Sequence, residues 1–163
     1  MEDPKELKKF LELIRSLSAK GAILAYHDRS DGGLAAALCE MMFASHVGVE
    51  IVADALVSKD RTLNQALFNE ELGAVIQVAR GRAAEVERDF EAAGMGWSLK
   101  YLGNLTQDDH LNIYLEGKCV LSEDRVDLQK AWNEVSWQIA RMRDNPECAD
   151  SEYALISDKH NGA

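Results

Sequence analysis

One short stretch, residues 27–33 (HDRSDGG), concentrates the residue types that can bind a metal ion and a phosphate. It follows the apolar run at residues 22–26, which predicts a buried strand, and it precedes an Ala- and Leu-rich segment from Leu34 that predicts a helix. Loops between a strand and a helix commonly bind ligands in proteins that mix the two. This stretch is therefore the first candidate for a binding site.

The composition of this loop suits a ligand made of Mg²⁺ and phosphate. Asp28 and Asp31 carry hard oxygen donors, and Mg²⁺ prefers one or two carboxylates together with phosphate oxygens and retained waters. Gly32 and Gly33 let the backbone approach a ligand closely, and the first N–H groups of the following helix favour an anion. Ser30 can donate a hydrogen bond to a phosphate.

The same residues are also typical of a turn that caps a helix. Ser30 or Asp31 can serve as the N-cap, and paired glycines make a tight turn. A histidine at a strand end, such as His27, is often a hydrogen-bonded structural residue, and Arg29 between acidic residues is typical of an ion pair. The sequence alone leaves ligand binding and helix capping both open.

A second polar cluster, residues 68–71 (FNEE), comes directly before the apolar residues 72–79, which predict the clearest strand of the chain. Asn69 and Glu70 lie either at a ligand pocket or domain interface, or in a solvated turn. Their role stays open at this stage.

Predicted helices and strands alternate irregularly along the chain. A hairpin at Gly117-Lys118 requires antiparallel pairing, so a mixed or antiparallel sheet with helices packed on it is expected, in an α/β or α+β layered domain. Helices are predicted over residues 5–20, from 34, and over 60–68, 81–93 and 125–142, and strands over 22–26, 47–52, 72–79, 98–105, 110–116 and 118–123.

The last predicted helix carries an apolar stripe whose spacing is typical of a core-facing helix: Leu128, Trp132, Val135, Ile139 and Met142. Trp137 lies off this stripe and favours a surface that a further domain covers. After Arg143 the periodicity ends. Pro146 and the acidic residues near it predict a linker or disordered tail over residues 144–163, which leaves residues 1–143 as one domain.

Composition narrows the range of partners and compartments. A net charge of −10 disfavours nucleic acid and anionic membranes as partners. The chain has no apolar stretch near the roughly 20 residues of a membrane span and no apolar signal region at its start. Cys39, Cys119 and Cys148 are odd in number and widely spaced, which argues against disulfides and zinc. A soluble, cytoplasmic protein is expected.

Three blocks of sequence carry a family resemblance. They are AYHDRSDGGLAAALCEMMFA, FNEELGAVIQV and the closing W-x₄-WQIARMRDNPECAD, in this order. Together they resemble the large, single-chain bacterial form of phosphoribosylformylglycinamidine synthase, from about residue 8 to residue 150. The resemblance implies the second C-terminal lobe of the aminoimidazole ribonucleotide synthetase superfamily, which is a layered α+β domain.

The resemblance also implies an activity and a site. Enzymes of this family are ATP-dependent ligases of purine biosynthesis, which convert formylglycinamide ribonucleotide to formylglycinamidine ribonucleotide with ammonia that a glutaminase domain releases from glutamine. Asp28 matches the family's Mg²⁺ ligand and Ser30 its ATP-contacting serine, while Asp31, Gly32 and Gly33 belong to the same motif.

The resemblance implies no catalytic residue in this chain, because the glutaminase triad and the other Mg²⁺ ligands belong to further domains. Cys148 is expected to be a plain linker thiol. The expected partners are the N-terminal synthetase lobes, the glutaminase domain, the nucleotide and the ribonucleotide substrate. By itself the chain is expected to self-associate and to show no synthase turnover.

Two alternatives remain within the same superfamily. The lobe has a structural role if its site holds an auxiliary nucleotide that supports the fold without turning over. Alternatively, it is part of another enzyme of the superfamily, such as a selenophosphate synthetase or a thiamine-monophosphate kinase. The FNEELGAVIQV and RDNPECAD blocks argue against this alternative.

Overall fold

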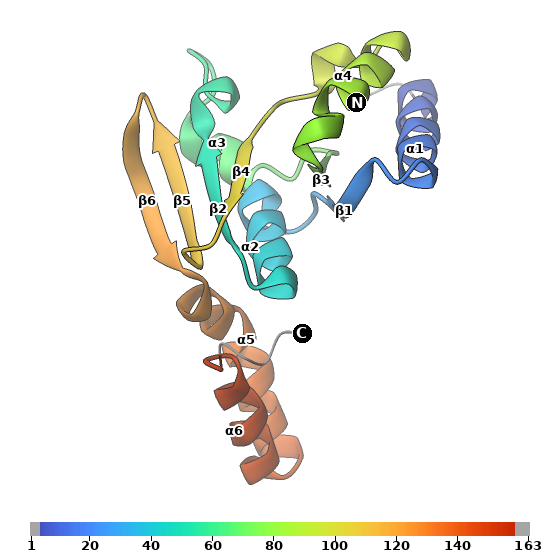
Figure 1. Ribbon diagram of the computed structural model, residues 1–163. Helices are drawn as coiled ribbons and strands as arrows, with labels where there is room; N and C mark the ends of the chain where they lie inside the picture. Colours follow the sequence, from blue (N-terminus) through green and yellow to red (C-terminus); the bar gives the residue numbers. More distant parts are fainter. Residues whose placement is uncertain (1–3, 159–163) are drawn as a thin grey trace. The chain divides into compact units, whose positions relative to one another are not determined.

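The computed structural model describes residues 4–158 and divides the chain into two compact units (Figure 1). Unit 1 comprises Met1–Ala37 and Leu67–Tyr101, and unit 2 comprises Leu38–Ala66 and Leu102–Ala163. Each unit combines helices with a sheet. The α+β layered class expected for this chain is therefore confirmed.

Unit 1 is built on a two-stranded antiparallel sheet of β1 (Ile23–Asp28) and β3 (Ala74–Val78). Helix α1 (Pro4–Ala19) contacts both β1 and helix α4 (Ala83–Ala92). The predicted helices over residues 5–20 and 81–93, with the strands between them, are confirmed to within a few residues at each end.

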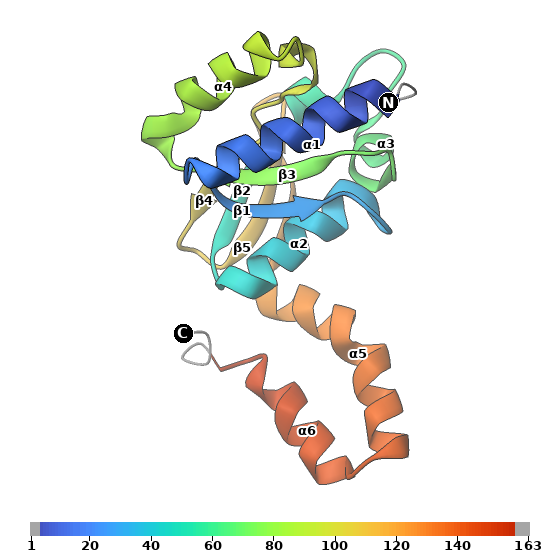
Figure 2. The same ribbon diagram turned by 90° about the vertical axis from the view of Figure 1, so that its right-hand side faces the viewer.

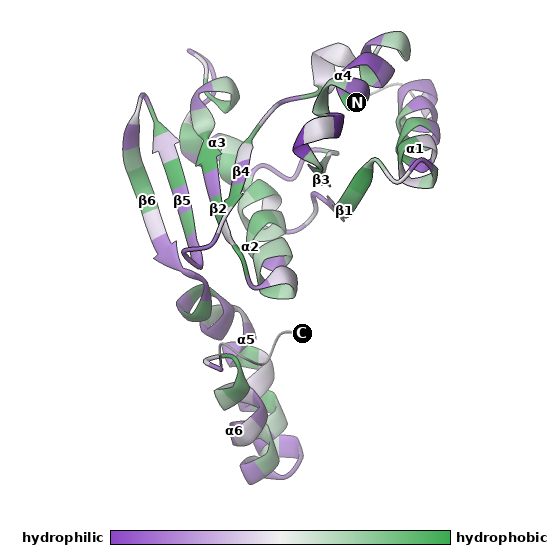
Figure 3. Cartoon of the chain, viewed as in Figure 1, coloured by the Kyte–Doolittle hydropathy of each residue, from purple (hydrophilic) through white to green (hydrophobic). Residues whose placement is uncertain are grey.

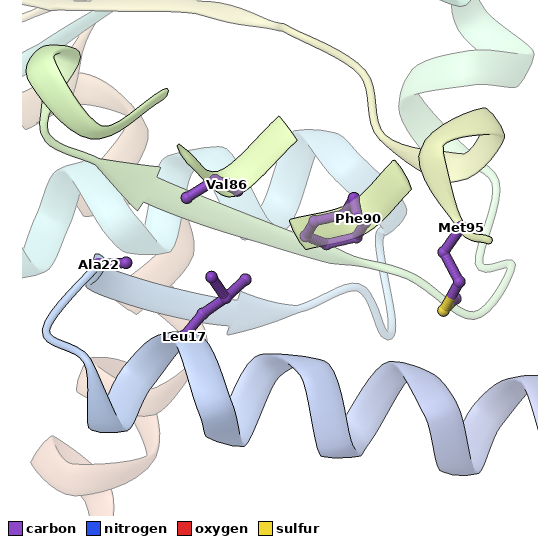
Figure 4. Packing of buried hydrophobic residues seen from close by; sticks show 5 residues of the cluster. All are labelled: Leu17, Ala22, Val86, Phe90 and Met95. Atoms are coloured by element: carbon purple, nitrogen blue, oxygen red, sulfur yellow. The ribbon is translucent and has the colours of Figure 1, made fainter. Parts of the chain in front are cut away.

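The core of unit 1 lies between these elements, and Figure 4 shows its five most buried side chains. Val86 and Phe90 are one helical turn apart on α4, and Leu17 comes from the last turn of α1. The cluster is completed by Ala22 and Met95, with Ile23, Ile76 and Val78 of the two strands packed against it. Because apolar burial drives this packing, it fixes β1 and so the loop that leaves its carboxyl end.

Unit 2 contains a four-stranded sheet in the order β4 (Gly103–Thr106), β2 (Gly48–Val52), β5 (His110–Leu115), β6 (Lys118–Asp124). β2 pairs in parallel with β5, and the other two pairings are antiparallel, so the sheet is mixed as predicted. Alternate residues of the two central strands are buried, as the two-residue period of a strand requires: Val49, Ile51, Leu111 and Ile113.

The hairpin between β5 and β6 turns on the two residues between Leu115 and Lys118, which pair with each other. Glu116 and Gly117 have φ values of +50° and +73°, the signs that a type I′ turn requires at both central positions. The predicted hairpin is confirmed. The strand predicted over residues 98–105 is confirmed only at its end, because a 3-10 turn occupies Gly96–Ser98 and β4 begins at Gly103.

Helix α2 (Gly33–Ser45) begins directly after the candidate loop, and Figure 3 shows apolar residues along most of its length. The short helix α3 (Leu63–Phe68) precedes the second polar cluster. Among the residues that the structure describes, no helix is long and apolar enough to cross a membrane.

The structure differs from the expected tail over residues 144–163, because Pro146–Leu155 form helix α6. Asn145 caps this helix: its side-chain oxygen accepts from the amides of Glu147 (2.9 Å) and Cys148 (3.3 Å). Pro146 takes the first helical position, where its missing N–H is harmless. The division into a domain over 1–143 and a linker after it stays a prediction.

Helix α5 (Arg125–Arg143) corrects two further expectations. The ring of Trp137, expected to be covered by a further domain, stacks instead on Tyr153 of α6 with centroids 4.2 Å apart. The stripe expected in the core is largely exposed instead, with Val135 at 68% and Met142 at 81% exposure. Sequence spacing identified the apolar face of α5 correctly, but α6 packs on the opposite face.

Candidate functional site

The candidate loop, residues 28–33, starts at the last residue of β1 and ends at the first residue of α2, as Figure 2 shows. Asp28 pairs with Ala74 in the sheet, and the amide of Arg29 donates to the carbonyl of Gly73 at 2.8 Å. The loop therefore leaves from a strand end that the core of unit 1 holds in place. The whole loop lies in unit 1.

Both loop glycines are required by the backbone. Gly32 and Gly33 have φ values of +78° and +68°, in the left-handed region that side-chain-bearing residues rarely adopt. A Cβ on Gly33 would also lie 2.7 Å from the carbonyl oxygen of Leu67 and 2.8 Å from that of Asn69. The loop thus packs directly against the backbone of the second polar cluster.

The structure separates the two interpretations of Ser30 and Asp31. Within the described part of the chain, neither side chain accepts a hydrogen bond from the first turn of α2. A backbone turn forms instead, in which the amide of Gly33 donates to the carbonyl of Ser30 at 2.9 Å. Side-chain capping, one of the two interpretations that the sequence left open, does not occur at this loop, and both side chains are exposed.

Two amides at the start of α2 are left open by this arrangement. Among residues 4–158 we find no hydrogen-bond acceptor for the N–H groups of Leu34 and Ala35. Such groups, reinforced by the dipole of a helix of 13 residues, favour an anion. The open amides follow the two glycines immediately in the sequence.

Asp28 presents its carboxylate at the exposed end of β1. It accepts no hydrogen bond from another described residue. Burial raises the pKa of the neighbouring Tyr26, and the negative charge of Asp28 raises it further. No group of three or more His, Cys, Asp or Glu residues that could hold a metal occurs among the described residues. Asp28 is therefore suited to be one protein ligand of an ion whose other ligands are phosphate oxygens, waters or groups from elsewhere.

The second polar cluster, whose role the sequence left open, lies against this loop. Asn69 accepts from the amide of Glu71 through Oδ1 at 2.6 Å, so the chain turns here. Glu70 Oε1 accepts from the amide of Gly32 at 3.2 Å, and Arg29 Nε donates to the carbonyl of Glu71 at 2.7 Å. Sequence reasoning singled out both clusters but carried no signal that they meet.

His27 and Arg29 have structural contacts of the kind expected for them. The Nδ1 atom of His27 lies 2.7 Å from the carbonyl oxygen of Asp28. The guanidinium of Arg29 forms an ion pair with Glu71, 3.4 Å from Nη2 to Oε2. These contacts hold the two side chains to the loop and to the second polar cluster.

One of the cysteines, Cys39, is not activated as a nucleophile. Burial, followed by the charge of Glu40, raises the pKa of Cys39 to about 11, so its thiol stays protonated at neutral pH. Cys148 lies in the first turn of α6 rather than in a linker.

Comparisons with known proteins agree with the fold. Residues 1–116 match the family model of AIR synthase related protein, C-terminal domain. A Thermotoga maritima PurL structure in complex with FGAR superposes with a TM-score of 0.68 at 16% identity, over 78% of this chain and 21% of that one. A complex of T. maritima PurL with ATP gives a TM-score of 0.62 at 15% identity, over 72% of this chain and 20% of that one.

The structure of PurLQS from Thermotoga maritima gives a TM-score of 0.66 at 16% identity, over 77% of this chain and 22% of the matched one. The present chain thus spans about a fifth of the solved chains that share its fold. The family match covers all of unit 1, including the loop that bears Asp28, Ser30 and the two glycines. The chain belongs to the family of AIR synthase related proteins, as their C-terminal domain.

Proposed function

We propose that this chain is a domain of an ATP-dependent carbon-nitrogen ligase that converts formylglycinamide ribonucleotide to formylglycinamidine ribonucleotide, and that its loop over residues 28–33 contributes to a Mg²⁺-nucleotide site. The observation that carries the proposal is the combination of an exposed carboxylate at the end of β1, two open amides at the start of α2, and two glycines whose positive φ values and close contacts disfavour a side chain. T. maritima PurL structures with FGAR, ATP and ADP support the choice of ligand.

In this proposal Asp28 is the Mg²⁺ ligand. Its carboxylate is exposed and makes no hydrogen bond to another described residue, so it can coordinate an ion without breaking an existing contact. A single carboxylate fits the way Mg²⁺ binds with a nucleotide, since the ion keeps waters and takes phosphate oxygens for its other positions. Bound there, the ion supplies charge neutralisation for the phosphates.

The backbone amides and Ser30 hold the phosphates. The N–H groups of Leu34 and Ala35 have no acceptor among the described residues, and they follow two glycines that expose the backbone. Ser30 carries an exposed hydroxyl beside them, and Asp31 completes the turn. Because the whole chain has a net charge of −10, a nucleotide needs Mg²⁺ and these amides to bind here.

The remaining parts of the proposal concern the larger protein. We place this chain in the second C-terminal lobe of the large, single-chain bacterial enzyme, which takes its ammonia from glutamine through a glutaminase domain. The preceding synthetase lobes then supply the other Mg²⁺ ligands, and the enzyme is cytoplasmic. The coverage of about a fifth of the T. maritima PurL chain supports a domain within a larger assembly.

The test compares Asp28→Ala with Asp60→Ala in the full-length protein. Both changes remove one exposed carboxylate, but Asp60 lies in unit 2, outside the loop. We expect Asp28→Ala to weaken Mg²⁺-dependent nucleotide binding at least about tenfold, because a ligand of the ion is lost. Asp60→Ala should leave it unchanged. Calorimetric titration with and without Mg²⁺ measures both.

Equal nucleotide affinities for the two variants and the unchanged protein would overturn the proposed site. A loss of bound nucleotide with full synthase turnover and a lowered melting temperature would keep the site but assign it an auxiliary, fold-supporting nucleotide. Loss of nucleotide together with loss of turnover would assign it to the reacting nucleotide.

A further inference from the structure

The loop donates hydrogen bonds to the second polar cluster from two of its residues, Arg29 and Gly32. From the loop, Arg29 Nε donates to the carbonyl of Glu71 at 2.7 Å. From the cluster, Glu70 Oε1 accepts from the amide of Gly32 at 3.2 Å. The partners are 42 and 38 residues apart in the chain, and both contacts lie within unit 1. We call this pair of contacts the loop clamp.

The two neighbouring glutamates contribute differently to the loop clamp. Glu71 takes part through its backbone carbonyl, and its side chain, 62% exposed, adds an ion pair to Arg29 at 3.4 Å that solvent weakens. Glu70 takes part through its carboxylate alone. A side-chain change at residue 70 therefore removes one half of the clamp, whereas the same change at residue 71 leaves both hydrogen bonds in place.

The contact of Glu70 falls at the most constrained point of the loop. Gly32 has a φ of +78°, and it precedes Gly33, which packs against the backbone of residues 67–69. Glycine has a wide range of accessible backbone conformations, so a contact at Gly32 restricts the loop where the chain is otherwise most free. The carboxylate of Glu70 accepts from the amide of Gly32, and the amide of Gly33 donates to Ser30. The two amides that follow, those of Leu34 and Ala35, have no acceptor among residues 4–158.

We propose that Glu70 is a positioning residue for the nucleotide site: its carboxylate fixes the backbone of Gly32 so that the amides of Leu34 and Ala35 are preformed for phosphate. This inference rests on the proposed function. It assigns to the second polar cluster a role in which the cluster does not contact the ligand directly. A carboxylate at this position repels the phosphates, so its benefit must come from the geometry that it holds rather than from its charge.

The experiment uses three variants: Glu70→Ala, Glu70→Gln and Glu71→Ala. Glu70→Gln keeps a side-chain oxygen that accepts from Gly32 and removes the charge, while Glu71→Ala removes the same charge as Glu70→Ala one residue away. The first measurement is the amide-water exchange rate of Gly32 by NMR in the present chain without ligand. We expect faster exchange only in Glu70→Ala.

The second measurement is the dissociation constant of Mg²⁺-AMPPCP, a nonhydrolysable nucleotide, from the full-length protein. We expect Glu70→Ala to weaken binding about tenfold, because the loop must now be ordered when the ligand binds. Glu70→Gln and Glu71→Ala should stay within about twofold of the unchanged protein or bind more tightly, since each removes a negative charge near phosphate.

The outcomes separate this inference from the proposed function. Unchanged Gly32 exchange in Glu70→Ala, or equal nucleotide affinity in Glu70→Ala and Glu71→Ala, overturns the positioning role while Asp28 stays a ligand. Weak binding in Glu70→Gln to the same extent as in Glu70→Ala also overturns it, since charge would then matter and geometry would not. An unchanged protein that binds no nucleotide overturns both proposals.

Discussion

Two turns of this protein concentrate carboxylates, and they use them in opposite ways. In the glycine loop of unit 1, residues 28–33, the carboxylate of Asp28 is exposed and two amides that follow the loop have no acceptor among the described residues. In the acidic turn of unit 2, residues 108–110, the sequence Asp-Asp-His looks at least as suited to a metal, yet its carboxylates are occupied by hydrogen bonds within the protein.

Asp108 accepts three hydrogen bonds from its own surroundings. They come from the hydroxyl of Thr106 (2.6 Å), the amide of His110 (3.3 Å) and the side-chain amide of Asn112 (3.0 Å). These bonds, that of Thr106 above all, hold the pKa of Asp108 below its ordinary value, against a small opposing effect of desolvation. A metal at this carboxylate would have to displace them.

Asp109 forms an ion pair with a buried arginine. Arg125, at the start of α5, is 1% exposed and donates to Asp109 through Nε at 2.6 Å and through Nη2 at 3.2 Å. The amide of Arg125 also donates to the carbonyl of Asp109 at 2.9 Å. The acidic turn therefore anchors a helix, whereas the glycine loop keeps its polar groups open. The carboxylates of the acidic turn are used for architecture, whereas that of Asp28 is available to a ligand.

The largest effect on the acidic turn is expected from Arg125→Ala. Removing one partner of a buried ion pair leaves the other uncompensated, so we expect a loss of about 3–5 kcal/mol in the free energy of unfolding. Arg143→Ala is the control, because its pair with Asp144 at 2.8 Å is exposed and solvent screens it, so its loss should change the free energy of unfolding little. Urea denaturation followed by circular dichroism measures both. Similar losses in the two variants would remove the contrast between anchored and solvated pairs.

In the glycine loop, Gly33→Ala should cost about 2–4 kcal/mol of stability. Its φ of +68° strains any side chain, and the added Cβ meets backbone atoms at 2.7–2.8 Å. Gly94→Ala is matched to it, with a φ of +70° and no atom within 4 Å of the new Cβ, so it should cost only about 1 kcal/mol. Thermal unfolding of both variants tests this. Equal losses would show that close packing on residues 67–69 does not restrict the loop.

A smaller effect concerns pH and the acidic turn. The pKa of His110 is raised, first by its contact with the Asp108 carbonyl and then by nearby acidic side chains, while its partial burial works against them. Because the folded pKa lies above the ordinary value of 6.5, this contribution to stability is complete below pH 6.5 and is lost as the pH rises through the raised pKa. The free energy of unfolding, measured by urea denaturation at increasing pH, should therefore fall less steeply with pH in His110→Gln than in the unchanged protein. Parallel curves would contradict this role.

Local chemistry in the sequence was enough to predict much of the fold and the place of the loop. The strand before His27 and the helix after Gly33 followed from apolar runs, and the β5–β6 hairpin followed from Gly117. The contact of Glu70 with Gly32 did not, because no local pattern relates residues 38 positions apart. The only sequence signal for this contact was that each polar cluster adjoins an apolar strand: the loop follows one, and residues 68–71 precede the other.

The end of the chain shows how the same residue type supports opposite predictions. Pro146 suggested the end of regular structure, but proline is also favoured at the first position of a helix, and Asn145 before it is a strong N-cap. The aromatic contact between Trp137 and Tyr153 joins α6 to α5, and a helix of 10 residues needs such packing to be stable. Composition alone contains no information about that contact.

The central claim is that the carboxylate of Asp28 and the first amides of α2 hold a metal-nucleotide complex together. Its most direct test is a crystal structure of the full-length protein with Mn²⁺ and AMPPCP, in which anomalous scattering locates the metal. The account predicts an anomalous peak about 2 Å from a carboxylate oxygen of Asp28, with a phosphate at the amides of Leu34 and Ala35. A well-ordered nucleotide and metal bound elsewhere, with Asp28 still contacting only solvent, would contradict it.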